Sequence, residues 1–313
     1  MLLLVAMYMT AQEPGAIALP DLLARVAEEA EILQHNAPKA LTTETLQQRT
    51  LLPPSRFRPR IGKAALETPK PRLQVREIVT EYSVGVLKDS ASRNLCEFRQ
   101  VISVDGRKVQ SVESARHALS LGLKSADDRA RKRMLEDFAR NGLVDIATDY
   151  GLILLAFSKR GQQDMQFVAA GEEQVGADTV LALNWEQTTD AGGVLEFHGN
   201  QAARRAMRGR LLLRKSDSLP MRVEVWTEHA QNGRSIRDEA TVDYVQSSHG
   251  FLVPASVVHR HVVDAQVITE NLYRYDPFKM FGADTEIKFT ELDTPPPPPA
   301  PSPPPAPSPP AKK

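Results

Sequence analysis

The second half of this chain is a succession of short segments in which apolar and polar residues alternate. Met221, Val223 and Val225, for example, alternate with Arg222 and Glu224. Alternation with a period of two places neighbouring side chains on opposite faces of a strand, so each segment predicts a strand with one apolar face. Short turns between the segments favour an antiparallel meander whose apolar face other elements must cover. The predicted strands are residues 164–170, 179–187, 194–198, 208–215, 221–229, 234–245, 256–263, 266–275 and 286–289.

Helical patterns are concentrated before residue 158. Residues 21–35 repeat apolar side chains every three or four positions, which predicts a helix. Residues 111–121 and 125–140 predict a helical block, and the apolar run at residues 143–157 predicts a further helix packed under the sheet. Together they form a helical insert at about residues 111–157.

Two further strands are expected between the first helix and the insert. They are residues 73–87 and 96–109, and the second contains Asp105-Gly106, a dipeptide that favours a type I′ hairpin turn. Residues 53–71 are rich in proline and arginine and predict a surface connection, with an anion site as the alternative interpretation. The fold class is therefore α+β, with one domain over residues 19–293.

The two ends of the chain differ from this domain. Residues 1–18 resemble a signal peptide because residues 2–9 are apolar and cleavage could follow Ala11 or Ala18, although a basic n-region is missing. The alternative is an apolar N-terminus packed on the domain. Residues 294–313 hold 12 of the 23 prolines and predict a disordered polyproline II tail, either a spacer or a ligand for a proline-binding module.

Parts of the second half resemble a known family. The stretches RGRLLLRKSDSLPMRVEVWTEH (residues 208–229), ATVDYVQSSHGFLVPASVVHRHV (residues 240–262) and NLYRYDPFKMF (residues 271–281) resemble the outer-membrane lipoprotein carrier and sorting proteins, the LolA/LolB-like superfamily. The resemblance implies an unclosed β-barrel, a strongly curved antiparallel sheet whose concave apolar face is covered by helices. In the carriers that hollow holds acyl chains. The helical insert departs from the small carriers.

This resemblance leads us to expect an apolar cleft between the sheet and the helices. Each methylene buried there contributes about 0.8 kcal/mol, so an acyl chain binds without any catalytic group. The alternative is that the same side chains simply fill a core. The expected lining residues are Leu211, Leu213, Met221, Val223, Val225, Val242, Tyr244, Phe251 and Leu252.

Two histidines are the best candidates for a metal site. His259 and His261 are two residues apart on one predicted strand, so they point to the same face, and His249 or Asp264 would have to complete the site. Because two histidines at this spacing are a weak signal, we expect no metal. Cys96 is expected to be a small buried hydrophobe rather than a nucleophile, since no base accompanies it in sequence.

Composition and motifs exclude several classes of protein. The 39 basic and 39 acidic residues balance, which argues against a nucleic-acid-binding protein. A single cysteine excludes a disulfide scaffold, and no apolar stretch is long enough to span a membrane. Neither a nucleotide-binding nor a hydrolase motif occurs. We therefore expect that the protein is not an enzyme and binds no cofactor.

The sequence leads to one function and two alternatives. We expect an exported, periplasmic protein of the bacterial envelope that binds a lipid or the acyl chains of a lipoprotein. The first alternative is an envelope module that senses or binds other proteins without lipid, and the second is a metal-dependent enzyme using His259 and His261. A lipid-binding protein requires an apolar cleft between the sheet and the helices. An interaction module requires a filled sheet and exposed apolar residues on the insert. An enzyme requires a third polar group beside the two histidines.

Overall fold

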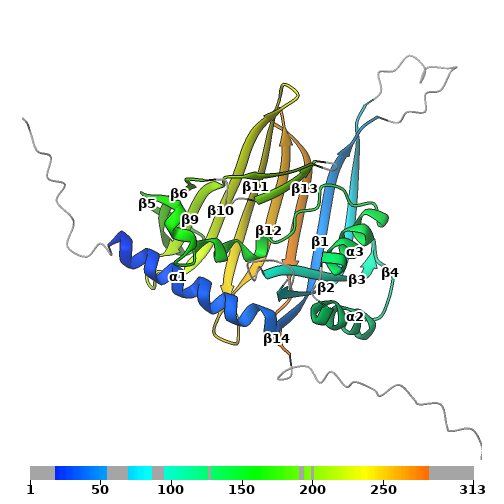
Figure 1. Cartoon of the computed structure of the whole chain (residues 1–313), viewed down its shortest axis with the longest axis horizontal. Helices are drawn as coiled ribbons and strands as arrows, with labels where there is room; N and C mark the ends of the chain where they lie inside the picture. The colour runs from blue at the N-terminus through cyan, green and yellow to red at the C-terminus, as the bar shows by residue number, and fades with distance from the viewer. Residues whose placement is uncertain are drawn as a thin grey trace, which may run out of the picture.

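A computed structural model describes residues 18–54, 70–86, 95–125, 128–189, 194–198 and 201–281. Its main feature is an antiparallel 12-stranded sheet whose main path is β4-β3-β2-β1-β13-β12-β11-β10-β9-β6-β5, with β14 also paired to β1 (Figure 1). In the described ranges the end strands β4 and β5 do not pair with each other, so the sheet is open. The expected unclosed antiparallel architecture is confirmed. The strands in this path are β1 (Ala40–Leu52), β2 (Arg72–Val86), β3 (Leu95–Val104), β4 (Arg107–Lys108), β5 (Met165–Val175), β6 (Asp178–Gln187), β9 (Arg208–Arg214), β10 (Pro220–Gln231), β11 (Arg234–Gln246), β12 (Leu252–Val263), β13 (Gln266–Tyr275) and β14 (Lys279–Met280).

The sheet is built from two meanders that meet at β1 and β13. β9 to β13 pair in chain order, as expected, and β1 to β4 do the same at the other side. The hairpin of β7 (Val194–His198) and β8 (Gln201–Arg205) lies outside this path and forms a small sheet of its own. The strand expected at residues 286–289, the signal-like segment except Ala18, the tail and most of residues 53–71 lie outside the described residues.

The sequence pattern did not predict β1, although it lies near the middle of the sheet. Its inward positions include Thr42, Glu44, Gln48 and Thr50, all buried, and Leu46 is the apolar side chain among them. Apolar and polar residues therefore do not alternate along β1. A strand that buries polar side chains is not detected by apolar periodicity.

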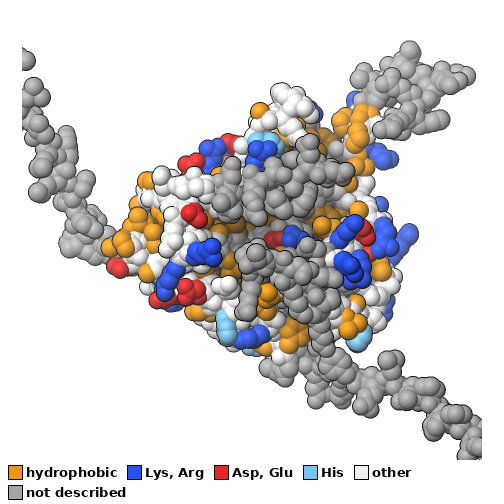
Figure 2. Space-filling view, in the orientation of Figure 1, with side chains coloured by type: hydrophobic (Ala, Val, Ile, Leu, Met, Phe, Trp, Pro, Cys, Tyr) orange, Lys and Arg blue, Asp and Glu red, His pale blue; other side chains and the backbone are white. Residues whose placement is uncertain are grey.

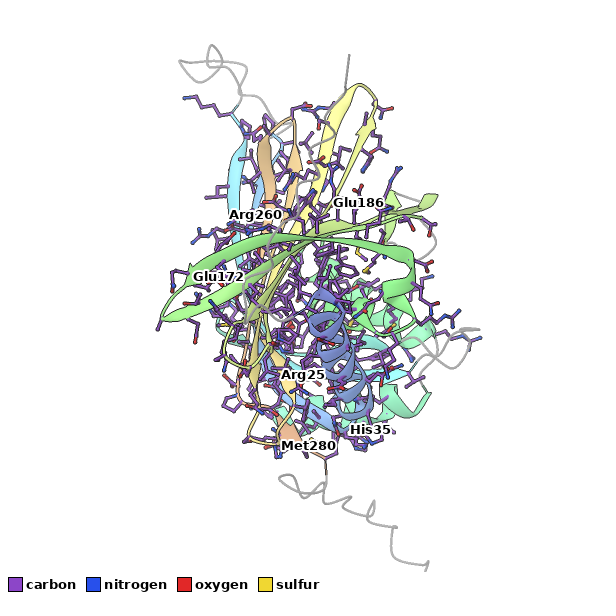
Figure 3. All side chains as sticks on the ribbon, turned by 90° about the vertical axis from the view of Figure 1, so that its left-hand side faces the viewer. Arg25, His35, Glu172, Glu186, Arg260 and Met280 are labelled. Carbon is purple, nitrogen blue, oxygen red and sulfur yellow. The ribbon has the colours of Figure 1, made fainter. Side chains whose placement is uncertain are left out.

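The expected N-terminal helix is α1 (Leu19–Asn36), which is followed by the short 3-10 helix η1 (Ala37–Lys39). Its apolar side, with Leu22, Val26, Ala30 and Leu33, is buried in the main core. Figure 3 shows α1, labelled at Arg25 and His35, packed over the side chains that fill the interior. None of the helices in the described ranges is long and apolar enough to cross a membrane.

The insert contains two helices, α2 (Val112–Ser125) and α3 (Asp128–Arg140). We call the sheet face that carries Leu211 the inner face and the opposite face the outer face. α2 covers the outer face of β2 and β3, where Leu119 packs against Cys96 and Phe98. α3 contributes Met134 to the inner core and ends shortly before Gly142, whose backbone is left-handed.

Residues 143–157, which we call the covering segment, are not the α-helix that the sequence predicted. They cross the inner face irregularly and then form the 3-10 helix η3 (Tyr150–Phe157), followed by η4 (Gly161–Asp164). Asp145 and Asp149 have left-handed backbones, with φ of 47° and 69°, which an α-helix excludes. The segment is nevertheless buried against the sheet, as its apolarity indicated.

The outer face of the central strands is polar and faces solvent. Arg237 on β11 pairs with Glu228 at 2.6 Å, and Arg260 on β12 pairs with Glu270 at 2.8 Å. Such exposed pairs each contribute about 0–1 kcal/mol. The apolar residues that alternate with these charges point to the inner face, so any apolar ligand site belongs there.

Candidate functional site

The inner face gathers nearly all of the side chains expected to line the cleft. Their exposed fractions are 5% or less, and they belong to one continuous core with α1 and η3. These buried residues are Leu211, Leu213, Val223, Val225, Val242, Tyr244, Phe251 and Leu252.

Met221 is the exception, and its predicted placement beside Val223 is wrong. The pairing of β10 with β9 shifts register between Pro220 and Arg222, which marks a β-bulge. The extra residue turns Met221 to the outer face, where it packs against Leu212 and Val180.

Little space remains between the inner face and its cover. The enclosed cavity there measures about 10 Å³, which is about the volume that one water molecule needs. It lies at the end of the sheet where α1 passes into β1. An acyl chain therefore enters this layer only if part of the cover moves. The cavity is lined by Leu33, Ala37, Ala40, Tyr82, Val84, Leu152, Phe251, Val253, Pro254 and Phe278.

Polar side chains of the inner face hold the first half of the covering segment by its backbone. The amide group of Gln48 donates to the carbonyl of Val144 at 2.7 Å and accepts from its N–H at 3.1 Å. Asn271 donates to the carbonyl of Asp145 at 2.9 Å, and the Tyr273 hydroxyl donates to the carbonyl of Ala147 at 2.6 Å. The polar residues of the sheet thus satisfy backbone groups of a buried, irregular segment.

The start of η3 is held in the same way. The Glu97 carboxylate accepts from the N–H groups of Asp149 at 2.6 Å and Gly151 at 3.0 Å. The Tyr244 hydroxyl donates to the Gly151 carbonyl and accepts from the Leu154 N–H, both at 3.1 Å. A Cβ at position 151 would lie 2.6 Å from the Glu97 carboxylate, so this position requires glycine.

A buried ionic cluster supports Glu97. Arg99, 2% exposed, donates to Glu44 at 2.7 and 2.8 Å and to Glu97 at 2.8 Å. Its guanidinium carbon lies 5.1 Å from the ring centre of Tyr82 and 5.3 Å from that of Tyr273. Burial raises the pKa of Glu44, and the charge of Arg99 opposes this shift. The cluster fixes the geometry of the groups that hold the covering segment.

The two histidines point to one face, as predicted, and they meet an aspartate that the sequence did not reveal. Asp238 Oδ1 on β11 lies 2.8 Å from His261 Nδ1 and 3.6 Å from His259 Nε2. Burial alone raises the pKa of Asp238, but its hydrogen bonds to the two histidines outweigh burial and hold the pKa well below its usual range. His259 also contacts Asn271, with 3.3 Å between the nitrogens, and so joins the network around the covering segment.

The residues proposed to complete a metal site do not join this cluster. Asp264 lies in the turn between β12 and β13, where its exposed side chain pairs with Arg234 at the start of β11, and His249 lies in the turn before β12. Within the described ranges, no group of three His, Cys, Asp or Glu side chains is arranged to hold a metal ion. His259 and His261 instead each contact Asp238.

Cys96 is 3% exposed and packs with Phe98 and Leu119, as expected for a small buried hydrophobe. Arg131 Nη1 lies 3.3 Å from its sulfur, and the same guanidinium binds Asp149. The thiol is therefore enclosed by α2 and by the Arg131 side chain of α3.

The cover of the inner face has two unequally attached parts. The covering segment is held by the many buried hydrogen bonds above. In the described residues, α1 is joined to the rest by apolar packing, by one side-chain hydrogen bond from Gln162 to the Leu23 carbonyl at 2.8 Å, and by a 4.0 Å ion pair between Lys159 and Glu31. Apolar packing is therefore what mainly holds α1 in place.

Comparison with known proteins gives only distant similarities. No family model matches the chain, and no curated protein matches it. Among solved structures, the chain is similar to a DUF1329 family protein from Desulfovibrio piger, with 10% identity and a TM-score of 0.35 over 87% of this chain and 95% of that one. It is also similar to a domain described as an outer membrane lipoprotein-sorting protein from Vibrio parahaemolyticus, with 9% identity and a TM-score of 0.33 over 85% of this chain and 95% of that one.

Proposed function

We propose that this protein is a non-enzymatic binding protein of the bacterial envelope that takes an acyl chain, from a lipid or a lipoprotein, between its sheet and α1. The observation that carries the proposal is the apolar inner face closed by a helix that is held mainly by apolar packing. Leu22, Val26 and Leu33 of α1 cover aliphatic side chains that an acyl chain would cover equally well. The structure then represents the closed state.

Binding in this scheme is an exchange of apolar contacts. Displacing α1 removes its contacts with the core, and each methylene of the incoming chain returns about 0.8 kcal/mol. The covering segment stays in place because its buried hydrogen bonds would be left unpaired if it moved. The proposal places the protein in the periplasm, where such cargo is handled.

One observation favours a second candidate, an interaction module without lipid. The inner face is filled, and Leu121 of the insert is 52% exposed while Leu135 is 37% exposed. A filled sheet with exposed apolar residues on the insert is what that function requires. Binding measurements with α1 variants separate the two candidates.

The test titrates a fluorescent fatty acid, cis-parinaric acid, into the wild-type protein and Leu33→Ala. Leu33 lies on the buried side of α1 and is 1% exposed, so the substitution weakens the closed state by about 2–5 kcal/mol. Apparent affinity scales with the population of the binding-competent state, so we expect saturable binding that becomes at least ~10-fold tighter in Leu33→Ala.

The matched control is Leu119→Ala. Leu119 is similarly buried (2% exposed), but it lies on α2, which packs on the outer face. The substitution should leave the affinity unchanged. Absence of saturable binding in both the wild-type protein and Leu33→Ala would overturn the acyl-chain function and leave the interaction module.

A further inference from the structure

The insert presents a basic surface that the proposed acyl site does not use. We define the basic face of α3 as Arg129, Lys132, Arg133 and Arg140, all exposed. Their spacing of three, four and seven residues places them on one side of the helix. The opposite side holds Met134 and Phe138 in the core, so the orientation of the helix is fixed. Figure 2 shows Lys and Arg gathered over this part of the molecule.

The charges of this face are only partly neutralised. Neither Arg129 nor Arg133 has an ion pair with a described residue, and Lys132 reaches Glu136 only at 4.0 Å. Arg140 pairs with Asp137 on the surface. Elsewhere on the sheet surface, cations such as Arg237 and Arg260 have close acidic partners. The basic face of α3 therefore differs from the outer face of β11 and β12, where the cations are paired.

One exposed apolar side chain and two further cations lie near the basic face. Leu135 is 37% exposed and lies three residues after Lys132 on α3, so the two side chains are neighbours on the helix surface. Arg107 and Lys108 form the exposed edge strand β4, which pairs with the same strand, β3, that α3 packs against. Cations next to exposed aliphatic side chains on a helix are typical of segments that lie in a membrane interface.

We propose that the basic face of α3 docks the protein on a membrane surface that carries anionic phospholipids. A phosphodiester headgroup supplies the negatively charged partner that Arg129 and Arg133 do not have among the described residues, and Leu135 enters the interface beside it. Each Lys or Arg near such a surface contributes about 1 kcal/mol. A nucleic acid is a poorer match because it offers no apolar layer for the exposed Leu135. Docking here is separate from acyl binding under α1.

The experiment measures sedimentation of the full chain with vesicles of phosphatidylcholine alone or mixed with phosphatidylglycerol. We expect binding to the mixed vesicles, none to phosphatidylcholine alone, and weakening by added salt. Arg129→Gln/Arg133→Gln should weaken partitioning about 30-fold, because two cations of about 1 kcal/mol each are lost.

The control is Arg160→Gln/Arg274→Gln, which removes two exposed arginines outside the insert and should bind like the wild-type protein. Circular dichroism checks that both variants fold. Equal weakening by both variants, no binding to the mixed vesicles, or retention on heparin without vesicle binding would each overturn the proposal. Acyl loading, measured separately with cis-parinaric acid, should be the same in both variants, so the two proposals fail independently.

Discussion

At the scale of single residues, the inner face is organised by polar groups rather than by apolar ones. Arg99 joins Glu44 and Glu97, and Glu97 in turn holds the start of η3. Sequence periodicity treats these residues as outward-facing because they are charged. Glu97 and Arg99 are two residues apart on β3, and a pair of opposite charges at that spacing is the signal that could have identified them.

We predict that Arg99→Met destabilises the protein by about 3–5 kcal/mol, because it leaves two carboxylates buried without a cation. Urea unfolding measures the change. Burial raises the pKa of Glu44, and the variant removes the Arg99 charge that opposes this shift, so Glu44 binds a proton more readily and one unpaired charge is lost as the pH falls. The loss of stability should therefore become smaller as the pH is lowered. Arg160→Met, at an exposed site, is the control and should change stability by about 0.5 kcal/mol or less. Equal losses in both variants would contradict the role of the cluster.

At the scale of elements, the covering segment is the piece whose structure the sequence mispredicted. Its apolar run suggested a helix, but the hydrogen-bonding groups of the sheet determine its path. The Tyr244 hydroxyl alone serves two of its backbone groups. Isolated 3-10 helices of this length are uncommon, so η3 depends on these contacts.

We predict that Tyr244→Phe destabilises the protein by about 1–3 kcal/mol, because the buried Gly151 carbonyl and Leu154 N–H both lose their hydrogen bond to the Tyr244 hydroxyl. Hydrogen exchange should become faster at Leu154 while the amides of β9 keep their relative protection. If Leu154 exchanged at the wild-type rate in the variant, the covering segment would not depend on this tyrosine.

At the scale of the whole molecule, α1 is the element that closes the sheet, and it carries a buried acid. Glu29 is 5% exposed and pairs with Arg25 at 2.7 Å. Burial raises the pKa of Glu29, and Arg25 partly opposes this. The docked helix therefore holds the Glu29 proton more tightly than the undocked chain does, so docking is strongest at acidic pH and weakens as pH rises through the native pKa.

We predict that Glu29→Gln removes this pH dependence and strengthens α1 docking at neutral pH. Protection factors of the α1 amides, corrected for the intrinsic exchange rate, should be higher in the variant than in the wild-type protein at neutral pH. Glu28→Gln is the matched control, because the Glu28 side chain is 57% exposed and should leave the protection unchanged. Lower protection in Glu29→Gln would show that the Arg25 pair outweighs burial.

The sequence by itself determined most of the segments that become strands, with β1 and β8 among the exceptions, where α1 lies, and that the sheet is antiparallel with one apolar face. These features follow from local periodicity and turn residues such as Asp105-Gly106, whose two backbones are left-handed as a type I′ turn requires. The buried positions of Leu211, Val223 and Val242 follow from the same alternation. Local chemistry is enough for these because each depends on neighbours within a few residues.

Only the tertiary structure decided the rest. The pairing of β1 with β13 brings together residues more than two hundred positions apart, such as Gln48 and Asn271, and a bulge at Met221 reverses one side chain. The convergence of Asp238 on two histidines and the path of the covering segment depend on strands that the chain aligns only after folding. Buried polar partners of this kind carry no periodic signal, because what satisfies each group is its partner across the sheet rather than its place in the sequence.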